Sequence, residues 1–413
     1  MKRVVITGMD MITSLGKDMN SSFSNIIRGE SGITKISNFD ASQLPVQIAG
    51  EIKDFDPKDY ISHKEIKKID RFIQLGLKTA IEAFTDANFS NSNIDYNDFG
   101  VVSASAIGGL PRIEEEALLL HNKGARKVSP FFIPASLVNL LGGTVAIHLG
   151  LKGPNLSSTT ACAASNHALS EACRLILLDQ AKIMLVVGAE STITPLGIAG
   201  FAALKSLSIN NDNPSSASRP FDVDRNGFVM AEGAGTLIIE EYEHAINRGA
   251  KIYAEIIGFG ESGDAYHMTT PSRDGPLRSM QKALKMAKSK DKDFKLDYIN
   301  AHATSTFIGD QNETAAIKEL LKNEIIPPIS STKGATGHAL GAAGMIESII
   351  TILAMKNSIL PPTINLKNQD IQNGCDLDYV PNIARQDKIF YAMNNSFGFG
   401  GTNGTIIFKN IRG

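Results

Sequence analysis

The sequence is poor in cysteine, and its few thiols form no obvious framework. Three cysteines occur among 413 residues, so they cannot all pair, and there is no C-x-x-C or H-x-x-x-H motif. On a continuous helix Cys162 and Cys173 would lie roughly 16 Å apart, which is too far for a disulfide. The pattern gives no signal for structural zinc, and free thiols fit a reducing cytoplasm.

The sequence also lacks an excess of charge and a long apolar run. The formal net charge is -2, which gives no global case for binding nucleic acid. A strand-like K-R-V-V-I-T-G begins at residue 2 and leaves no room for a signal peptide. The apolar segment 345–355 is interrupted by Glu347 and is too short to cross a bilayer. We therefore expect a cytoplasmic protein that binds neither nucleic acid nor membrane.

What the chain does contain is a regular alternation of short β-branched runs and longer helical patterns. The predicted strands cover 4–8, 99–105, 183–191, 236–242, 253–260, 296–302, 327–330, 389–396 and 405–410. The predicted helices cover 65–88, 134–149, 163–180, 276–288, 310–322 and 339–356. This alternation indicates an α/β fold with largely parallel, buried strands. The polar segment 204–235 is predicted to be a long surface excursion.

A faint internal repeat suggests two related halves. The tripeptide S-S-T occurs at 157–159 and again at 330–332, and each copy is followed by H-A-L and an apolar helical pattern. The chain is also too long for one small core. We place the divide near residue 250, which gives halves 1–250 and 251–413.

Cys162 stands in a run of unusually small residues, S-S-T-T-A-C-A-A-S. Apolar residues follow it at helical spacing, so it is predicted to lie at a helix N-terminus. Unpaired N–H groups and the helix dipole favour a thiolate there, and the same groups suit an oxyanion. The alternative is an ordinary buried thiol, which is how we interpret Cys173 and Cys375.

Two of the eight histidines, His302 and His338, lie in sequence contexts that are typical of catalytic residues. His302 ends a predicted buried strand, where the carboxyl end of a strand opens onto the site in α/β sheets. His338 lies among Gly and Ala residues that are too small to shield it. Each alone is more often a core residue, but together with Cys162 they suggest a cysteine–histidine site. The glycine-rich 398–404 is no dinucleotide loop, because a strand follows it where a helix is required.

Five motifs spread along the chain carry a family likeness. They are G-M-D-M-I-T at 8–13, K-G-P-N-L-S-S-T-T-A-C-A at 152–163, A-S-R-P-F-D-V-D-R-N-G-F at 217–228, P-P-T-I-N-L at 361–366 and G-F-G-G-T-N-G at 398–404. With them the chain resembles, over nearly its full length, the β-ketoacyl-[acyl carrier protein] synthases of the thiolase superfamily, and most closely the elongating synthase II. The resemblance implies a five-layered α-β-α-β-α fold of two similar halves and a homodimer.

The resemblance also implies an acyltransferase chemistry. Cys162 would accept an acyl chain from acyl carrier protein as a thioester. His302 and His338 would hydrogen-bond the malonyl thioester carbonyl while carbon dioxide leaves, and the resulting carbanion would attack the acyl-cysteine. No cofactor or metal is implied, because a thioester is itself an electron sink.

Further residues match supporting positions of the family. The backbone N–H groups of Cys162 and Phe399 would form the oxyanion hole, and Phe399 between its glycines would be a gate. The other matches are Lys333 and Glu347 as an ion pair, Thr304 and Thr306 as pantetheine contacts, Ile107 in the acyl pocket and Gly400 in the substrate loop. Lys64, Lys67 and Lys68 on one helix, together with Lys205, would dock the acidic carrier, although a solvated helix face is the usual role of such a run.

Four positions depart from the family pattern, and two alternatives remain once a thiolase is discounted, because the late Cys375 lies in a polar loop. Ala303, Asp10 and Ala231 replace expected glycines, and Phe307 replaces an expected proline. The methyl of Ala303 beside His302 and the ring of Phe307 beside Thr304 and Thr306 would narrow the passage through which the pantetheine arm reaches Cys162. A polyketide ketosynthase has the same triad, and a non-catalytic chain-length subunit would have lost the cysteine. A thiolase would need a second catalytic cysteine near 398–404.

Overall fold

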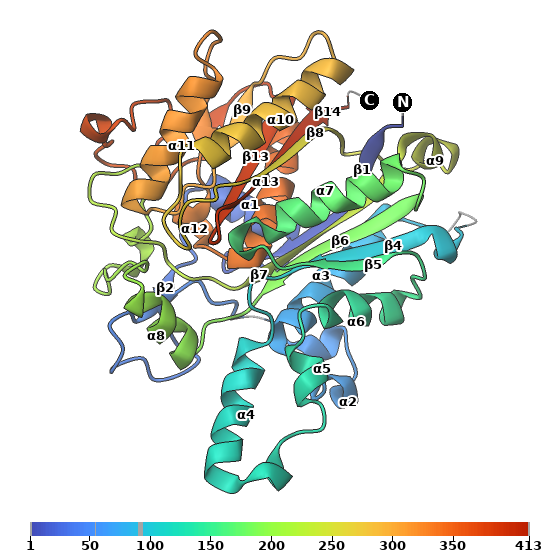
Figure 1. The fold of residues 1–413 in the computed structure, drawn as a ribbon, viewed down its shortest axis with the longest axis vertical. Coiled ribbons are helices and arrows are strands. Elements are labelled where there is room, and N and C mark those ends of the chain that lie inside the picture. The colour runs from blue at the N-terminus through green and yellow to red at the C-terminus, as the bar shows by residue number, and fades with distance from the viewer. Residues whose placement is uncertain (1, 54, 90–93, 412–413) are drawn as a thin grey trace.

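A ten-stranded sheet forms the centre of the molecule in a computed structural model that describes residues 2–53, 55–89 and 94–411 (Figure 1). Its strand order is β10-β9-β13-β14-β8-β1-β7-β6-β4-β5. The strands are β1 (Val4–Ile12), β4 (Phe99–Ala104), β5 (Asn155–Ser158), β6 (Ile183–Glu190), β7 (Gly233–Glu241), β8 (Ala254–Gly263), β9 (Tyr298–Asn300), β10 (Ile329–Ser330), β13 (Tyr391–Gly398) and β14 (Thr402–Asn410). Every predicted strand is therefore present, and β5 is an additional one.

The two halves of the sheet repeat one strand order. In the first half β4 lies parallel to β5 and β6, and β7 runs antiparallel to β6 and β1. In the second half β9 lies parallel to β10 and β13, and β14 runs antiparallel to β13 and β8. The first strand of each half, β1 and β8, pair with one another and join the halves. The predicted divide at residue 250 falls between α9 (Tyr242–Asn247) and β8, and stays a prediction.

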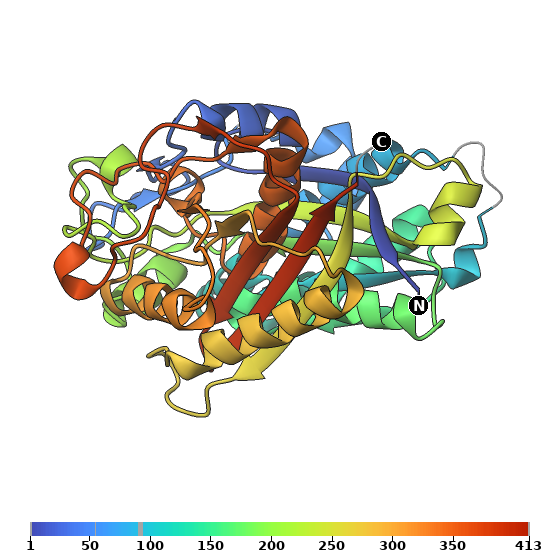
Figure 2. The same cartoon turned by 90° about the horizontal axis from the view of Figure 1, so that it is seen from above.

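Helices form three layers around these strands. The first half is covered by α3 (Arg71–Ala87) and α6 (Leu140–Leu149), and the second by α10 (Asp274–Lys290) and α11 (Phe307–Leu320). The helix α10 packs on β8 and β14, and Figure 2 shows it in yellow-orange beside the red strands. Between the halves lie α7 (Ala164–Leu177) and α13 (Ala343–Asn357), and each contacts strands of both. The expected five-layered α-β-α-β-α arrangement is confirmed.

The helix α13 is apolar on all sides because it lies at the centre of the molecule. A helix without a polar face is stable only where it is enclosed. The longer run Leu340–Asn357, which contains the segment 345–355, is long and apolar enough to cross a membrane by length and composition alone. However, 89% of the run is buried inside the protein, which identifies it as a core helix.

Both central helices begin in the same way, which gives the faint sequence repeat a structural meaning. A left-handed residue, Ala161 or Leu340, opens a single 3-10 turn in each half, with φ of 49° and 42°. The α-helix continues directly from that turn. Cys162 lies in the first of these turns, and His338 lies two residues before the second.

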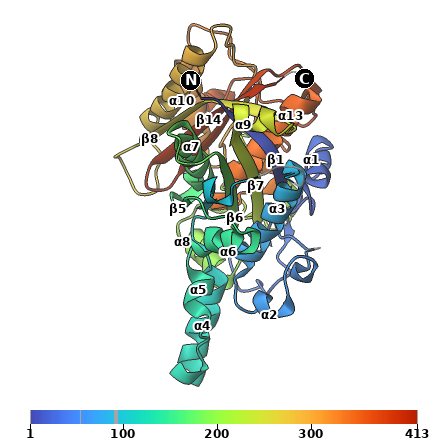
Figure 3. The ribbon, with the colours of Figure 1, turned by 90° about the vertical axis from the view of Figure 1, so that its right-hand side faces the viewer.

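The segment 204–235 is a surface excursion only in its first part, where residues such as Leu204, Ile209 and Val223 are exposed. Every residue from 227 to 235 is buried, and Phe228, Val229 and Met230 belong to an apolar cluster that also contains Leu340. A separate surface projection is formed by α4 (Leu110–Lys123) and α5 (Phe132–Ser136), which extend away from the sheet (Figure 3). The sequence analysis predicted no helix at 110–123.

Candidate active site

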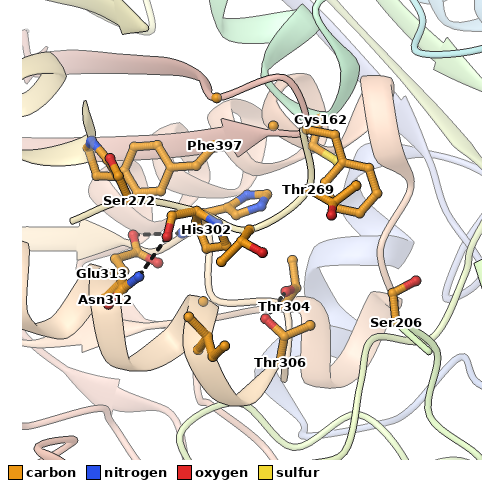
Figure 4. Close-up of a pocket in the computed structure, with 18 of the residues that line it drawn as sticks. Cys162, Ser206, Thr269, Ser272, His302, Thr304, Thr306, Asn312, Glu313 and Phe397 are labelled. Atoms are coloured by element: carbon orange, nitrogen blue, oxygen red, sulfur yellow. Dashed lines mark hydrogen bonds between the residues drawn. The ribbon is translucent and has the colours of Figure 1, made fainter. Parts of the chain in front are cut away.

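Cys162 lies at a cavity of about 350 Å³ that opens at the surface. Both predicted histidines, His302 and His338, line the same cavity, although they come from the other half of the chain. Thr304 and Thr306 line it as well, and Figure 4 shows them with Cys162 and His302 around one space. The structure thus brings together the cysteine, the two histidines and the two threonines that the sequence predicts.

His338 is the histidine that contacts the thiol. Its Nε2 atom lies 3.0 Å from Sγ of Cys162. The ring of His302 meets that of His338 edge-to-face at a centroid distance of 5.4 Å. The two imidazoles are therefore adjacent, and a small group seated between them and the sulfur would meet all three side chains.

The backbone of His338 is fixed by the segment that we expected at the surface. The N–H of His338 donates to the carbonyl of Val229 at 2.8 Å, and the N–H of Ala231 donates to the carbonyl of His338 at 3.0 Å. The ring of Phe228 packs edge-to-face on the imidazole at 5.2 Å. The methyl of Ala231 lies against Gly337, where a Cβ would come within 2.9 Å of it. This alanine is tolerated because its neighbour is a glycine.

The backbone of His302 is held by a carboxylate that the sequence analysis missed. Glu313 in α11 accepts the N–H of His302 at 2.9 Å and that of Ala303 at 2.8 Å, and it also accepts from the side chain of Asn395. Glu313 is buried, and burial raises its pKa. An acidic residue inside the apolar pattern 310–322 is the signal that could have found it. Ala303 is buried beside these bonds, and its φ lies outside the left-handed region, so an alanine fits there without backbone strain.

Burial keeps the histidines neutral and opposes the expected thiolate. The pKa values of His302 and His338 are lowered well below the usual range by desolvation, with the charge of Lys333 adding to the effect. Desolvation also raises the pKa of Cys162 to about 12, although Lys333 and nearby N–H groups act in the other direction. The expectation that Cys162 has a lowered pKa in the resting site was therefore wrong. The resting pair is a neutral thiol beside a neutral imidazole.

The two backbone N–H groups predicted to form the oxyanion hole lie near the sulfur. The backbone N–H groups of Cys162 and Phe399 both interact with Sγ and favour its anion. Gly398 allows this approach, because a Cβ there would lie 3.0 Å from the nitrogen of Cys162 and 2.9 Å from the carbonyl oxygen of Thr160. The same donors would reach a negative oxygen on an acyl group attached to the sulfur.

Phe399 lies half-buried in the cavity wall, and only one of its flanking glycines has a special backbone conformation. Gly400 has a φ of 80°, whereas the φ of Gly398 lies outside the left-handed region. Gly400 does not line the cavity, and its N–H donates to the carbonyl of Met268 at 2.7 Å. The ring of Phe399 meets that of Phe201 at 6.4 Å. A backbone conformation that favours glycine is thus present only on the C-terminal side of Phe399, and the hinge stays a prediction.

The two threonines are held in place by a buried arginine. Arg225 donates to the carbonyl of Phe307 at 3.0 Å and to that of Thr306 at 3.4 Å. Its charge is balanced by Asp370, 2.8 Å away. The hydroxyls of Thr304 and Thr306 lie 3.1 Å apart on the cavity wall. Arg225 is a second positioning residue that sequence reasoning did not single out.

The predicted ion pair of Lys333 and Glu347 is present behind the histidines. Both side chains are buried, they are bonded to one another, and neither is among the residues that line the cavity. Burial raises the pKa of Glu347 to about 7, while Lys333 lowers it. The pair therefore acts on the site through charge, without touching the cavity.

Ile107 shares one apolar cluster with Cys162 but is not among the residues that line the cavity, so its place in an acyl pocket stays a prediction. Its N–H donates to Glu190, which also accepts from Ala106 and from Gly341 at 3.1 Å. Glu190 is fully buried, and burial raises its pKa. This carboxylate joins the predicted acyl pocket to the segment that follows His338.

The docking lysines are not arranged as predicted. The helix α2 (His63–Ile66) spans four residues, so Lys64 lies within it, Lys67 caps it and Lys68 follows it. The expected long basic helix face is therefore absent, and Lys68 instead lies over the ring of Phe131 at 5.3 Å. Of the four predicted lysines, all within the described residues, Lys205 alone lines the cavity.

The remaining departures from the family pattern are accommodated in different ways. Asp10 forms a buried ion pair with Lys78 at 2.5 Å and accepts the N–H of Met19. Phe307 begins α11 at the cavity mouth, where it lies over Arg225.

In the described ranges 2–53, 55–89 and 94–411, no three His, Cys, Asp or Glu side chains are grouped as metal ligands.

Two family models match the chain. "Beta-ketoacyl synthase, N-terminal domain" matches residues 1–245, and "Beta-ketoacyl synthase, C-terminal domain" matches residues 253–367. The 3-oxoacyl-[acyl-carrier-protein] synthase 2 of Vibrio harveyi is 47% identical over 412 residues, with 99% of each chain covered. The protein of that name from Synechocystis is 44% identical over 409 residues, which is 99% of this chain and 98% of the relative.

Solved structures agree with this likeness. A β-ketoacyl synthase from Burkholderia phymatum matches with a TM-score of 0.92 and 34% identity over 100% of both chains. A ketosynthase solved with a type II polyketide acyl-carrier protein matches with a TM-score of 0.87 and 34% identity, covering 99% of this chain and 100% of that one.

Proposed function

The chain belongs to the beta-ketoacyl synthase family, and from this premise we propose that it is a 3-oxoacyl-[acyl carrier protein] synthase that elongates fatty acids by two carbons. The observation that carries the proposal is the 3.0 Å contact between Nε2 of His338 and Sγ of Cys162, beside His302 and two backbone donors. This arrangement combines a nucleophile, an oxyanion hole and a pair of neutral donors in one pocket.

The first half-reaction transfers an acyl group to Cys162. The sulfur attacks the carbonyl carbon of acyl-carrier thioester, and the negative oxygen of the tetrahedral adduct lies in the hole made by the N–H groups of Cys162 and Phe399. The adduct collapses, its bond to the carrier sulfur breaks, and the carrier thiol takes the proton that the cysteine lost. His338 is the side chain placed to hold that proton during the exchange.

The second half-reaction forms the carbon–carbon bond. The carboxylate of malonyl carrier leaves as carbon dioxide, and its bonding electrons form an enolate whose oxygen accepts hydrogen bonds from His302 and His338. Both imidazoles are neutral, so each offers an N–H without releasing a full proton. The enolate carbon attacks the acyl carbonyl on Cys162, the sulfur is expelled, and 3-oxoacyl carrier is released.

An elongation assay tests this proposal. Purified protein is supplied with a ladder of acyl-carrier primers and malonyl carrier, and the products are identified by mass spectrometry. A fatty-acid synthase releases a product two carbons longer than each accepted primer. Absence of any elongated product with every primer would contradict the proposal.

A polyketide ketosynthase is the second candidate, because a structural neighbour from such a system shares 34% identity. The 47% identity to a relative named 3-oxoacyl-[acyl-carrier-protein] synthase 2 favours the first candidate. The same assay separates them, because a polyketide enzyme would extend one chain repeatedly without release between steps. A non-catalytic chain-length subunit is disfavoured by the presence of Cys162.

The proposal includes a homodimer in the cytoplasm. The edge strand β5 leaves one side of the sheet unpaired, and its Leu156 is exposed. The projecting segments carry more exposed apolar side chains, including Ile113, Leu118 and Ile133. A second copy would cover these surfaces, since unpaired edges and grouped apolar residues favour association. Light scattering at micromolar concentration tests the dimer, and a monomeric mass would contradict it.

A further inference from the structure

The second ring nitrogen of His338 has no hydrogen-bond partner in the part of the chain that the structure describes. This atom, Nδ1, is buried, whereas Nε2 lies 3.0 Å from Sγ of Cys162. A histidine in a reactive site is commonly oriented by a hydrogen bond to the nitrogen that does not react. The position of this imidazole therefore depends on its backbone and on the ring of Phe228 that packs against it.

The backbone of His338 forms one edge of a short ladder, which we call the His338 ladder: residues 50–52, 229–232 and 338. The middle segment, 229–232, bonds to His338 on one side, as described above. On its other side the carbonyl of Met230 accepts the N–H of Gly50 at 2.9 Å. The imidazole is therefore held only as firmly as the middle segment is held.

The middle segment is anchored by the side chain of Glu232. This buried carboxylate accepts two hydrogen bonds from the guanidinium of Arg71, both of 2.8 Å. It also accepts the N–H of Ile52 at 2.8 Å and the hydroxyl of Ser191 at 2.7 Å. Arg71 donates a further bond to the carbonyl of Ile52 at 2.8 Å. The ion pair thus joins two of the three segments of the ladder.

Helix stability does not explain the position of Arg71. It is the first residue of α3, at the positive end of the helix dipole, where a cation is disfavoured. Within the described ranges it is the only cation at ion-pair distance from Glu232. A bidentate pair of this kind fixes its partners in orientation as well as in distance. Loss of Arg71 would leave a buried carboxylate without a counter-charge, which is strongly destabilising and favours a local shift.

The other histidine of the site has a separate support. Glu313 of α11 holds the backbone of His302, and its hydrogen-bond partners lie outside the His338 ladder. Neither Arg71 nor Glu232 is among the residues that line the cavity. A shift of the ladder would therefore move one imidazole, leave the other in place and change no contact with substrate directly.

We propose that Arg71 and Glu232 are positioning residues for His338: their ion pair fixes the His338 ladder, and the ladder holds Nε2 of His338 at the sulfur of Cys162. This inference rests on the proposed function, and it adds a support outside the cavity on which acylation depends. A misplacement of about 1 Å can cost about 10²-fold in rate, so a pair that touches no substrate can control this step.

The test compares two ion pairs of the same helix. Arg71→Met breaks the pair with Glu232. Lys78→Met is the matched control, because Lys78 also lies in α3 and forms a buried ion pair with Asp10, and the partners of that pair lie outside the His338 ladder. Acylation of Cys162 by acyl carrier is measured by quenched-flow mass spectrometry, and stability is measured by urea unfolding.

We expect Arg71→Met to slow acylation at least about tenfold, whereas Lys78→Met should stay within about threefold of the wild type although it also loses stability. Arg71→Lys keeps the charge but not the bidentate geometry, so it should slow acylation by a smaller factor with little loss of stability. Equal slowing by Arg71→Met and Lys78→Met would overturn the inference. If Arg71→Met does not fold, Arg71→Lys decides alone, and a wild-type rate in it would overturn the inference.

A double-mutant cycle tests the route through His338. If Arg71 acts by positioning this imidazole, Arg71→Met should change acylation less than about twofold in a His338→Ala background, because the group that it positions is gone. Full multiplication of the two effects would show that the pair acts on another part of the site, and it would overturn the inference.

Iodoacetamide labelling of Cys162 separates this inference from the proposed function, because it needs neither carrier nor turnover. At pH 7 labelling should slow by similar factors in Arg71→Met and His338→Ala, since the thiol loses its neighbouring base in both, and Lys78→Met should label like the wild type. Labelling of Arg71→Met at the wild-type rate would overturn the inference. A protein that shows the expected labelling pattern but elongates no primer would instead contradict the proposed function.

Discussion

The Nε2 atom of His338 lies 3.0 Å from the sulfur of Cys162, so this imidazole is placed to serve both halves of the proposed reaction. The family resemblance implied that both histidines contact the malonyl group. The structure adds that His338 also contacts the thiol and can take its proton. His302, one ring further away, has no such contact with the sulfur among the described residues.

Cys162→Ala should abolish condensation but still release carbon dioxide from malonyl carrier. Acyl transfer needs the sulfur, whereas decarboxylation needs only donors at the thioester carbonyl, and the histidines remain. The measurement is labelled carbon dioxide release beside mass spectrometry of the acyl-enzyme. Loss of decarboxylation in this variant would show that the sulfur takes part in that step.

The two histidine variants should differ in acylation. His302→Ala should lower decarboxylation by about 10² to 10³-fold, the usual effect of a lost oxyanion donor, and leave acylation of Cys162 largely intact. His338→Ala should lower decarboxylation similarly and also slow acylation, because the thiol loses its neighbour. Rapid acylation in His338→Ala, measured by quenched-flow mass spectrometry, would assign the proton of the thiol to another group.

Alkylation of Cys162 should accelerate with pH well beyond neutrality. Burial raises the pKa of this thiol to about 12 and lowers those of both histidines, so neither a thiolate nor an imidazolium is populated at pH 7. The rate of iodoacetamide labelling should therefore rise through pH 9 without a plateau, with Cys162→Ala as the control. A plateau below about pH 8.5, the pKa of a free thiol, would mean that the helix N-terminus outweighs burial.

Phe399→Ala should impair turnover more than stability. The ring is half-buried, and Gly400 beside it has a φ of 80°, which gives the segment a backbone conformation that other residues rarely adopt. We expect a large loss of kcat with a small change in melting temperature. A large fall in melting temperature with near-normal turnover would instead make Phe399 a packing residue.

Asp10 and Lys78 should depend on one another for stability. Lys78→Met leaves a buried carboxylate unpaired, which costs about 3–5 kcal/mol, and Asp10→Gly/Lys78→Met should cost less than this single change. The pKa of Asp10 is raised to about 6 by burial, so the folded state binds the proton more tightly than the unfolded state. The penalty of Lys78→Met should therefore be largest at pH 7 and smaller at pH 5. Urea unfolding at both pH values measures this, and a double variant less stable than Lys78→Met would contradict it.

The strands could be predicted because their signal is local. Runs such as V-V-I-T and I-M-L-V-V are buried on both faces, and their β-branched residues show this without knowledge of their neighbours. The edge strand β5 could not be predicted, because N-L-S-S has no apolar pattern and is a strand only through its pairing with β4.

The reacting residues and the supporting ion pair of Lys333 and Glu347 were predicted from the sequence, but two other supporting residues were not. Cys162 and His338 stand out because small neighbours surround them. Arg225 and Glu313 could not be singled out in this way, because a charged residue is expected at the surface unless its buried partner is known. The pairing of Arg225 with Asp370 joins positions far apart in the chain, and local patterns do not contain such information.

The position of β1 has a consequence for the order in which the molecule is made. β1 is synthesised before the other strands of its sheet, yet it lies in the middle of that sheet, between β7 and β8. One of its edges stays without a partner until residues 254–263 have been synthesised. A nascent chain that stops near residue 250 therefore carries an open, apolar strand edge, which is a template for aggregation. The sheet is completed only after the chain has passed its midpoint, so the early product needs protection for longer than a chain whose halves close separately.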